Sequence, residues 1–266
     1  MTISRKKQSV KKDSSLSRVI AQRTGDWLLA GVDDYLEKSA GFRSDPGWFH
    51  PSALSHQCDA FLAFAYLGLD GKGTMRARTR RILDNGTSRD EDVKRYLHYS
   101  GLSILKHWGG SPKERKLASA ERYIEIPHAR IRGECDDVVF NRVTGETFVF
   151  EFKTMNNDEW KELRGPKSDH ITQIQPYMFA KGILQAVIVY ENKNDQQWRQ
   201  FRVRFNGELW GSIITRTQNI IEMINSKQVP WRTPIPYDDK CQFHWTCSGF
   251  QFNGEDNATK GLSANS

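Results

Sequence analysis

Two carboxylates and a lysine are interleaved with apolar residues in the segment GECDDVVFNRVTGETFVFEFKT, which runs from Gly133 to Thr154. Asp136 comes before a stretch rich in Val, Glu151 lies inside a stretch rich in Phe, and Lys153 follows two residues after Glu151. Carboxylate oxygens are hard ligands that suit divalent cations such as Mg²⁺, and the lysine adds a further positive charge. The residue types in this segment therefore favour a cation held by two carboxylates.

The same segment is predicted to form an antiparallel β-hairpin around the turn-rich sequence NRVTGE. Its register is set by pairing Phe140 with Thr147, and in that register Asp136 lies opposite Glu151. Side chains opposite each other in such a pair lie about 4.5–5.5 Å apart at Cβ, so two like charges repel unless a cation lies between them. Lys153 shares their face, because a strand repeats every two residues. An ordinary exposed face, with its charges paired to Lys153, is the alternative.

Strands bracketed by helices surround this hairpin, which predicts an α/β fold with a mixed central sheet flanked by helices. Strands are predicted at 120–131, 133–140, 147–153, 185–191 and 198–205. Helices are predicted at 26–40, from about Ser52, and at 90–101, 169–182 and 207–226. In the hairpin, Phe148, Phe150 and Phe152 share the face opposite Glu151, and this apolar face is expected to pack.

The positive charge of the chain is concentrated in residues 1–25, where seven Lys or Arg stand against one Asp and carry +6 of the net +7. Such a tail either binds a polyanion or is only a solvated disordered arm. The predicted organisation is a basic disordered tail at 1–25, one domain at 26–251 and a polar tail at 252–266. The domain would comprise a helical N-terminal part at about 26–115, an α/β core at about 118–205, and a C-terminal helix with a cysteine-containing segment at about 206–251.

The sequence argues against a membrane or secreted protein. It contains no run of eighteen apolar residues, and the N-terminal MTISRKKQSVKKDSSLSR lacks the apolar centre of a secretory signal. Its four cysteines do not look like the disulfide framework of a small secreted protein. We therefore expect an intracellular, cytoplasmic location, which would be the host cytoplasm for a phage protein.

Three motifs resemble a known family. The elements GECD and EFK resemble the GxxD and ExK elements of the PD-(D/E)XK nucleases, whose core is restriction-endonuclease-like. Downstream, HITQIQPYMFAKG resembles the QxxxY element of the RecB-like exonuclease branch, through Gln173 and Tyr177. At helical spacing these two share a face with His170 and Lys181, which would suit a surface that holds phosphate or the attacking water. The other stripe suits the core and contains Ile171, Ile174 and Met178. An ordinary amphipathic helix is the alternative.

The resemblance extends upstream and covers about 49–250 in the order of the family. HPSALSHQCDAFLAFAYLGLDG resembles its early helix, and ILDNGTSRDEDVKRYLHYSGL resembles its Gly-xxx-His helix. Members include CRISPR-associated RecB-like exonucleases and phage exonucleases. This sequence departs from the family where a metal-binding His is common, because Asp90 stands four residues after Gly86. An aspartate is a competent ligand for Mg²⁺ or Mn²⁺; alternatively, Asp90 only caps a helix.

The resemblance implies a Mg²⁺- or Mn²⁺-dependent deoxyribonuclease, and more narrowly an exonuclease in recombination, repair or phage DNA processing. The implied metal ligands are Asp90, Asp136, Glu151 and the carbonyl of Phe152. Lys153 would orient the attacking water or stabilise the transition state, while Gln173, Tyr177 and His170 would position the DNA strand. The alternatives are a catalytically silent DNA-binding module, a phage structural protein, and an endonuclease or junction resolvase.

Other residues are candidates for holding DNA, single- or double-stranded. The basic stretch before the helix predicted at 90–101 would track phosphates, through Arg76, Arg78, Arg80 and Arg81. Trp108 or Trp160 would stack on unpaired bases if exposed, although most Trp residues are expected in the core. Recombination or phage proteins are the expected protein partners.

The cysteines suggest a second metal site at the C-terminal end. Many family members bind a [4Fe-4S] cluster through one early and three late cysteines, and Cys58, Cys241 and Cys247 match three of these positions, with Asp238 at the fourth. His244 offers instead a Cys₃His set for structural Zn²⁺. The third alternative is that these cysteines bind no metal and only pack. Cys135 is expected in the core.

Overall fold

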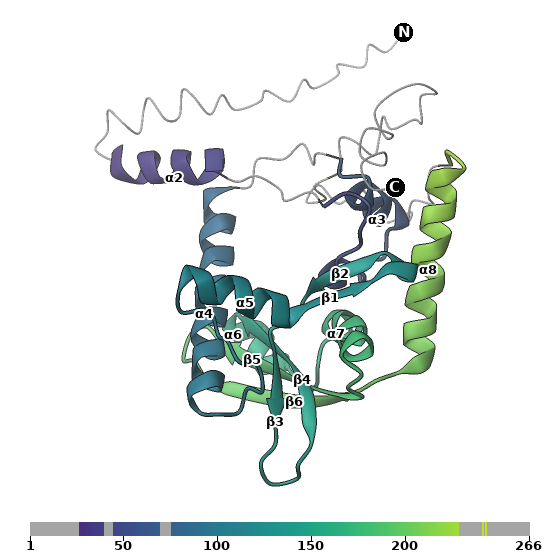
Figure 1. Cartoon of the computed structure of the whole chain (residues 1–266). Coiled ribbons are helices and arrows are strands. Elements are labelled where there is room, and N and C mark those ends of the chain that lie inside the picture. Colours follow the sequence, from purple (N-terminus) through teal and green to yellow (C-terminus); the bar gives the residue numbers. More distant parts are fainter. Residues whose placement is uncertain (1–26, 40–44, 70–75, 229–240, 242, 244–266) are drawn as a thin grey trace. The chain divides into compact units, whose positions relative to one another are not determined.

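The computed structural model describes residues 27–39, 45–69, 76–228, 241 and 243 (Figure 1). These residues form two compact units, of which the first consists of 27–39 and 76–83. The first unit contains helix α2 (Trp27–Ser39) and the beginning of α4 (Ala77–Tyr99), and an ion pair joins Asp33 to Arg81. The predicted limits of the domain and its two tails stay predictions, because 1–26 and 244–266 lie outside the described residues.

A mixed four-stranded sheet forms the centre of the second unit. Its strands, in spatial order, are β3 (Asp137–Phe140), β4 (Thr147–Met155), β5 (Gln185–Asn192) and β6 (Trp198–Arg204). Only β4 and β5 are parallel, and the chain between them contains α6 (Asn157–Glu162) and α7 (Ser168–Lys181). Parallel neighbours need such a crossover. The predicted α/β class with a mixed sheet flanked by helices is confirmed.

Two strand predictions were partly wrong. Residues 120–122 belong to a helix, and the rest of 120–131, together with the start of 133–140, forms a separate two-stranded sheet. The chain runs through α5 (Pro112–Arg122), β1 (Tyr123–Ile126), a 3₁₀ turn η2 (Pro127–Ala129) and β2 (Ile131–Glu134). Pro127 lacks an N–H, and Arg130 has a φ of 51°, so the strand breaks and folds back on itself. β1 pairs with β2, and the chain then passes through Cys135 and Asp136 into the larger sheet.

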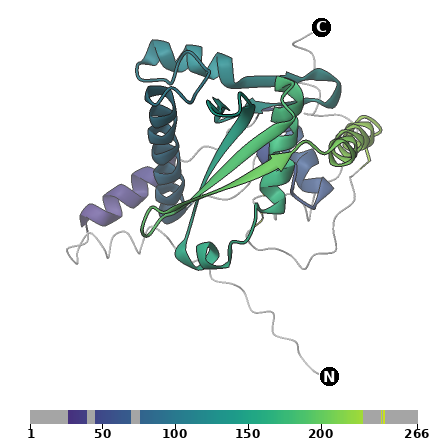
Figure 2. The ribbon, with the colours of Figure 1, turned by 90° about the horizontal axis from the view of Figure 1, so that it is seen from below.

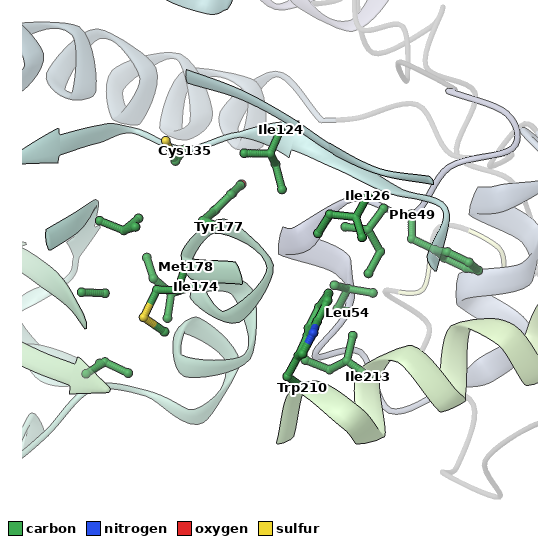
Figure 3. Close-up of a cluster of buried hydrophobic side chains, with 14 of the residues drawn as sticks. Phe49, Leu54, Ile124, Ile126, Cys135, Ile174, Tyr177, Met178, Trp210 and Ile213 are labelled. Atoms are coloured by element: carbon green, nitrogen blue, oxygen red, sulfur yellow. The ribbon is translucent and has the colours of Figure 1, made fainter. Parts of the chain in front are cut away.

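Helices cover both faces of the four-stranded sheet (Figure 2). On one face, Val93 of α4 packs with the buried side chains of Phe150, Phe152 and Val189. On the other face, α7 contacts β4 and β5, and its residues Ile174 and Met178 are fully buried (Figure 3). The predicted apolar stripe of this helix is therefore confirmed for these two positions. Both hairpin faces pack, whereas only the Phe face was expected to do so.

The remaining helices differ from the sequence predictions mainly at their starts. The helix predicted from Ser52 is a single 3₁₀ turn, η1 (Pro51–Ala53), followed by α3 (Asp59–Tyr66). The helix predicted at 90–101 is the second half of the 23-residue α4, which continues through Gly86. Predicted helix 207–226 agrees closely with α8 (Gly207–Asn225). None of the helices described is long and apolar enough to cross a membrane.

Candidate functional site

Asp136 is held at the point where β3 begins. The observed pairing of Phe140 with Thr147 and of Asp137 with Phe150 is the predicted register, and Asp136 directly precedes the first paired residue. One carboxylate oxygen of Asp136 accepts a hydrogen bond from the backbone N–H of Phe152 at 2.7 Å. The N–H and C=O of one strand residue point to the same side. The Phe152 carbonyl therefore points toward the Asp136 side as well, as its predicted role as a ligand requires.

Glu151 lies inside the protein, with 1% of its surface exposed. Its Oε1 accepts hydrogen bonds from Lys153 Nζ at 2.5 Å and from Gln173 Nε2 at 2.7 Å. Its Oε2 is buried and has no hydrogen-bond partner among the described residues. A buried carboxylate oxygen without a partner is costly, so this atom is one place where a cation would be stabilising.

Gln173 and Tyr177 approach the site from α7, but they do not form the surface that the helical pattern suggested. Both are buried, and Gln173 donates a hydrogen bond to Glu151. Figure 3 shows Tyr177 extending from α7 toward Cys135 and Ile124. Their burial differs from the surface that was expected, because α7 also packs against β1. The role of these two side chains toward phosphate or the attacking water stays a prediction.

α4 brings a third carboxylate and a second lysine. Asp90 lies well inside this helix, so the alternative that it caps a helix is wrong. Lys94, one turn later, contacts Asp90 Oδ2, and its Nζ lies 3.9 Å from Asp136 Oδ1. The other oxygen of Asp90 is buried without a partner in the described part of the chain. Lys94 was not predicted; its spacing of four from Asp90 was the available signal.

The charges of these groups act on one another. Burial, followed by the negative charge of Asp136, raises the pKa of Glu151 to about 8 and that of Asp90 to about 7. Burial opposes the charges of Lys94 and Lys153, yet the neighbouring carboxylates raise the pKa of both. Three carboxylates and two ammonium groups thus occupy a region of low solvent access, and these five groups carry a net charge of −1 when all are ionised.

Asp137, the neighbour of Asp136, was also missed. It is fully buried, and its Oδ1 accepts hydrogen bonds from the hydroxyl of Ser103 and from the N–H of Val138, each at 2.7 Å. Burial raises its pKa, and these two hydrogen bonds, followed by the positive charge of the buried Arg122, oppose that shift. The double acidic motif in CDD was the sequence signal. The hydrogen bond from Ser103 holds Oδ1, whereas Oδ2 of Asp137 is buried without a partner among the described residues, like one oxygen each of Glu151 and Asp90.

The residues predicted to hold DNA belong to different units: His170 to the second, and the four arginines to the first. His170 Nδ1 lies 2.8 Å from the Tyr190 hydroxyl, and burial followed by the charge of Lys153 lowers its pKa to about 4. His170 is therefore neutral at neutral pH. The four basic residues predicted to track phosphates, Arg76, Arg78, Arg80 and Arg81, belong to the first unit, and Arg81 pairs with Asp33. Their role with DNA stays a prediction.

Of the two Trp residues considered for stacking, Trp160 belongs to the core. Its ring is buried, and the guanidinium carbon of Arg199 lies 4.3 Å from the ring centroid. Trp108 is half-buried, with its ring 6.0 Å from that of Tyr99. Stacking of a base on Trp160 is thereby excluded, and Trp108 remains a candidate.

A buried ion pair attaches α4 to the sheet next to Asp90. Glu191 of β5 is 3% exposed and accepts hydrogen bonds from Arg89 Nε at 2.8 and 2.9 Å and from the Arg89 NH2 group at 2.7 Å. The indole N–H of Trp198 also donates to Glu191. Because Arg89 immediately precedes Asp90, this pair fixes the part of α4 that carries the third carboxylate.

The carboxylates offer donors for a divalent metal. No group of three or more His, Cys, Asp or Glu in the described ranges is placed closely enough to hold an ion as it stands. The chemistry of the donors nevertheless fits Mg²⁺ or Mn²⁺, because these are hard carboxylates and Glu151 and Asp90 each have a buried oxygen without a partner in the described part of the chain. A small movement of Lys94 would in addition free the other oxygen of Asp90, Oδ2, for a cation.

The predicted cysteine site is partly described. Cys58 and Cys241 both pack against one small cluster, which consists of Ala60, Phe64 and Phe243. The other candidate ligands, Asp238, His244 and Cys247, lie outside the described residues. Cys135 is buried in the main core, as predicted. Cys58 and Cys241, which are far apart in the sequence, thus pack against the same apolar cluster. The three alternatives, an iron–sulfur cluster, zinc and no metal, stay open.

The sequence matches no protein-family model, and no curated protein matches it. Among solved structures, SSO0001 has 13% sequence identity and a TM-score of 0.48, and the match covers 85% of this chain and 97% of that one. LHK-Exo in complex with dAMP has 19% identity and a TM-score of 0.46, with 68% of this chain and 89% of that chain covered. LHK-Exo, an alkaline exonuclease from Laribacter hongkongensis, matches in a further structure with 18% identity, a TM-score of 0.44, and coverage of 76% and 93%. Similarity this distant establishes neither a family nor an activity for the chain.

Proposed function

We propose that this protein is a metal-dependent deoxyribonuclease that hydrolyses DNA phosphodiester bonds, more narrowly an exonuclease of the PD-(D/E)XK type. The observation that carries the proposal is the buried carboxylate of Glu151. Its Oε2 has no partner among the described residues, its Oε1 contacts Lys153, and the negative charges of Asp136 and Asp90 act on it. A fold gains no stability from carboxylates crowded in this way, so their arrangement points to chemistry. The order GxxD, ExK and QxxxY in the sequence supports the same assignment.

The proposed metal ligands are Asp90, Asp136, Glu151 and the Phe152 carbonyl. A bound Mg²⁺ or Mn²⁺ would polarise the phosphodiester and lower the pKa of a water molecule that attacks it. The chain's own groups do the positioning. Gln173 fixes the Glu151 carboxylate through Oε1, and the Phe152 N–H fixes that of Asp136.

Lys153 supplies the positive charge nearest to Glu151, and we assign it to the negative charge that develops on the phosphoryl oxygens. His170 is neutral and so can accept or donate a hydrogen bond to the DNA strand without adding charge. The basic residues at the beginning of α4 and in the N-terminal tail would add salt-sensitive affinity for phosphates. Recombination, repair and phage DNA processing are the processes that such an activity would serve.

The first experiment uses the unmodified protein on end-labelled linear and circular DNA, single- and double-stranded, with Mg²⁺ or Mn²⁺ or with EDTA. We expect mononucleotides or short products from linear DNA with metal present and no cleavage in EDTA. Cleavage of circles would instead indicate an endonuclease or resolvase. Binding of DNA without cleavage under any metal condition would contradict the proposal and favour a silent DNA-binding module or a structural protein.

We also propose that Cys58 and Cys241 bind a structural metal, either as part of an iron–sulfur cluster or with zinc. Their packing against one small cluster supports this. Protein purified without oxygen is expected to contain iron with sulfide, or zinc, and Cys58→Ser or Cys241→Ser should remove most of it. Cys135→Ala serves as the control because Cys135 lies in the main core. Equal metal content in all four proteins, measured by elemental analysis and absorbance, would contradict a site at these cysteines.

A further inference from the structure

The ammonium group of Lys94 lies between two carboxylates that the proposed function assigns to a metal. It contacts Asp90 Oδ2, and it lies 3.9 Å from Asp136 Oδ1. Only 16% of the Lys94 side chain is exposed, against 24% for Asp90 and 19% for Asp136. The lysine therefore offsets charge where solvent can do little of that work.

Lys94 and Lys153 form their shortest ion pairs with different carboxylates. Lys153 contacts Glu151 and follows it on the same strand, whereas Lys94 contacts Asp90 from the same helix. Without Lys94, Asp90 would lose its ion-pair partner, and the repulsion between Asp90 and Asp136 would be less well offset. The position of the Lys94 ammonium group is the one that a metal bound by the same two carboxylates would need.

We propose that Lys94 is a tethered cation: it neutralises Asp90 and Asp136 in the metal-free protein and gives up the Asp90 oxygen when a divalent ion binds. It would therefore set how tightly the site holds the ion. The inference rests on the proposed function, because it takes Asp90 and Asp136 as metal ligands. Lys94 is suited to this exchange, since an ammonium group on a four-carbon stem can move while its backbone stays in the helix.

Exchange with a lysine has two measurable consequences. The ion must displace the ammonium group, so the affinity for metal is lower than the three carboxylates alone would give. The metal-free protein, in turn, is stabilised by the lysine. Removal of the charge should therefore change metal affinity and metal-free stability in opposite directions, which a lysine with only a structural role would not do.

The test compares Lys94→Met with the unmodified protein by calorimetric titration with Mn²⁺ at about pH 8, where protons compete less for the carboxylates. Lys94→Met should bind Mn²⁺ at least about tenfold more tightly. In EDTA it should melt at a lower temperature than the unmodified protein, and Mn²⁺ should remove the difference. Lys116→Met, at an exposed position, is the control and should change neither quantity.

A second variant keeps the positive charge, so it tests the proposal even if the protein does not fold with Met at position 94. Lys94→Arg replaces the mobile ammonium with a planar guanidinium that can hold Asp90 through two hydrogen bonds. It should bind Mn²⁺ more weakly than the unmodified protein. The affinity for Mn²⁺ should therefore fall in the order Met, Lys, Arg at position 94.

The experiment distinguishes failure of the proposed role of Lys94 from failure of the proposed function. If Asp136→Asn abolishes Mn²⁺ binding but Lys94→Met binds as tightly as the unmodified protein or less tightly, the role of Lys94 is overturned and the metal site stands. If the unmodified protein binds no Mn²⁺ and Lys94→Met binds none either, both the tethered cation and the proposed function are overturned.

Discussion

Replacement of Glu151 by glutamine is expected to reduce DNA cleavage by at least about 10³-fold, with the protein still folded. The amide keeps the shape of the side chain and can still accept the hydrogen bond that Gln173 donates, but it has no charge for a metal. Single-turnover cleavage of end-labelled DNA at saturating Mn²⁺ measures the loss. A titration with Mn²⁺ then tells a lost ligand from a lost catalytic group, because a lost ligand raises the metal concentration needed.

The matched control is Glu162→Gln, which makes the same chemical change at an exposed position outside the site. It should cleave DNA at the rate of the unmodified protein. If Glu151→Gln cleaved DNA as fast as this control, the carboxylate would not be part of the active site. Circular dichroism would show whether Glu151→Gln had unfolded. In that case Glu151→Asp would be used for the cleavage experiment instead.

The same variant should alter how stability depends on pH in the absence of metal. The folded protein raises the pKa of Glu151 from the ordinary 4.5 to about 8, chiefly by burial. Between these values the folded state holds a proton that the unfolded chain has released, so the free energy of unfolding falls as the pH rises through this interval. Glu151→Gln cannot release that proton. Urea unfolding in EDTA at about pH 5 and about pH 8 should therefore show a smaller decline for the variant.

Replacement of Glu191 by alanine is expected to lower the free energy of unfolding by about 3 kcal/mol. It removes a buried carboxylate that accepts three hydrogen bonds from Arg89, and it also takes the acceptor from the Trp198 indole. We expect a value at the lower end of the range for buried pairs, because 21% of the Arg89 side chain is exposed and can be hydrated. Urea unfolding followed by fluorescence measures the change.

A double-mutant cycle shows whether the pair itself is responsible. Arg89→Met combined with Glu191→Ala should cost less than the sum of the two single changes, because no buried charge is left unpaired. Additive costs would mean that each side chain contributes independently. A loss of metal affinity in Glu191→Ala would further show that the pair positions Asp90, its neighbour in α4.

The hairpin was predictable because its pattern is local. Alternation with a period of two and a short turn rich in turn-forming residues fix the register, and Phe140 indeed pairs with Thr147. The positions of α7 and α8 were predictable for a similar reason, since each has a long periodic pattern with a Gly or Asn near its ends. These features depend on neighbours in the sequence, so one sequence is enough to find them.

The other parts of the site depend on contacts between distant segments. Lys94 meets Asp136 only because α4 packs against the sheet, and Arg89 meets Glu191 across 102 positions of the chain. The break between β2 and β3 likewise follows from the pairing of β2 with β1, which alternation alone does not reveal. Gln173 and Tyr177 looked exposed because their stripe is polar, yet α7 is packed on that side too.

The β3–β4 turn contains Val143, which is 94% exposed, and it lies at the opposite end of the hairpin from Asp136 (Figure 1). Extra residues in this turn would extend into solvent and leave the two strands aligned. One extra residue between Asp136 and Phe140 would instead reverse the direction of the Asp136 side chain relative to Glu151. If Asp136 and Glu151 act together as proposed, the segment can change in length during evolution only at this turn, because an insertion in either strand would separate the two carboxylates.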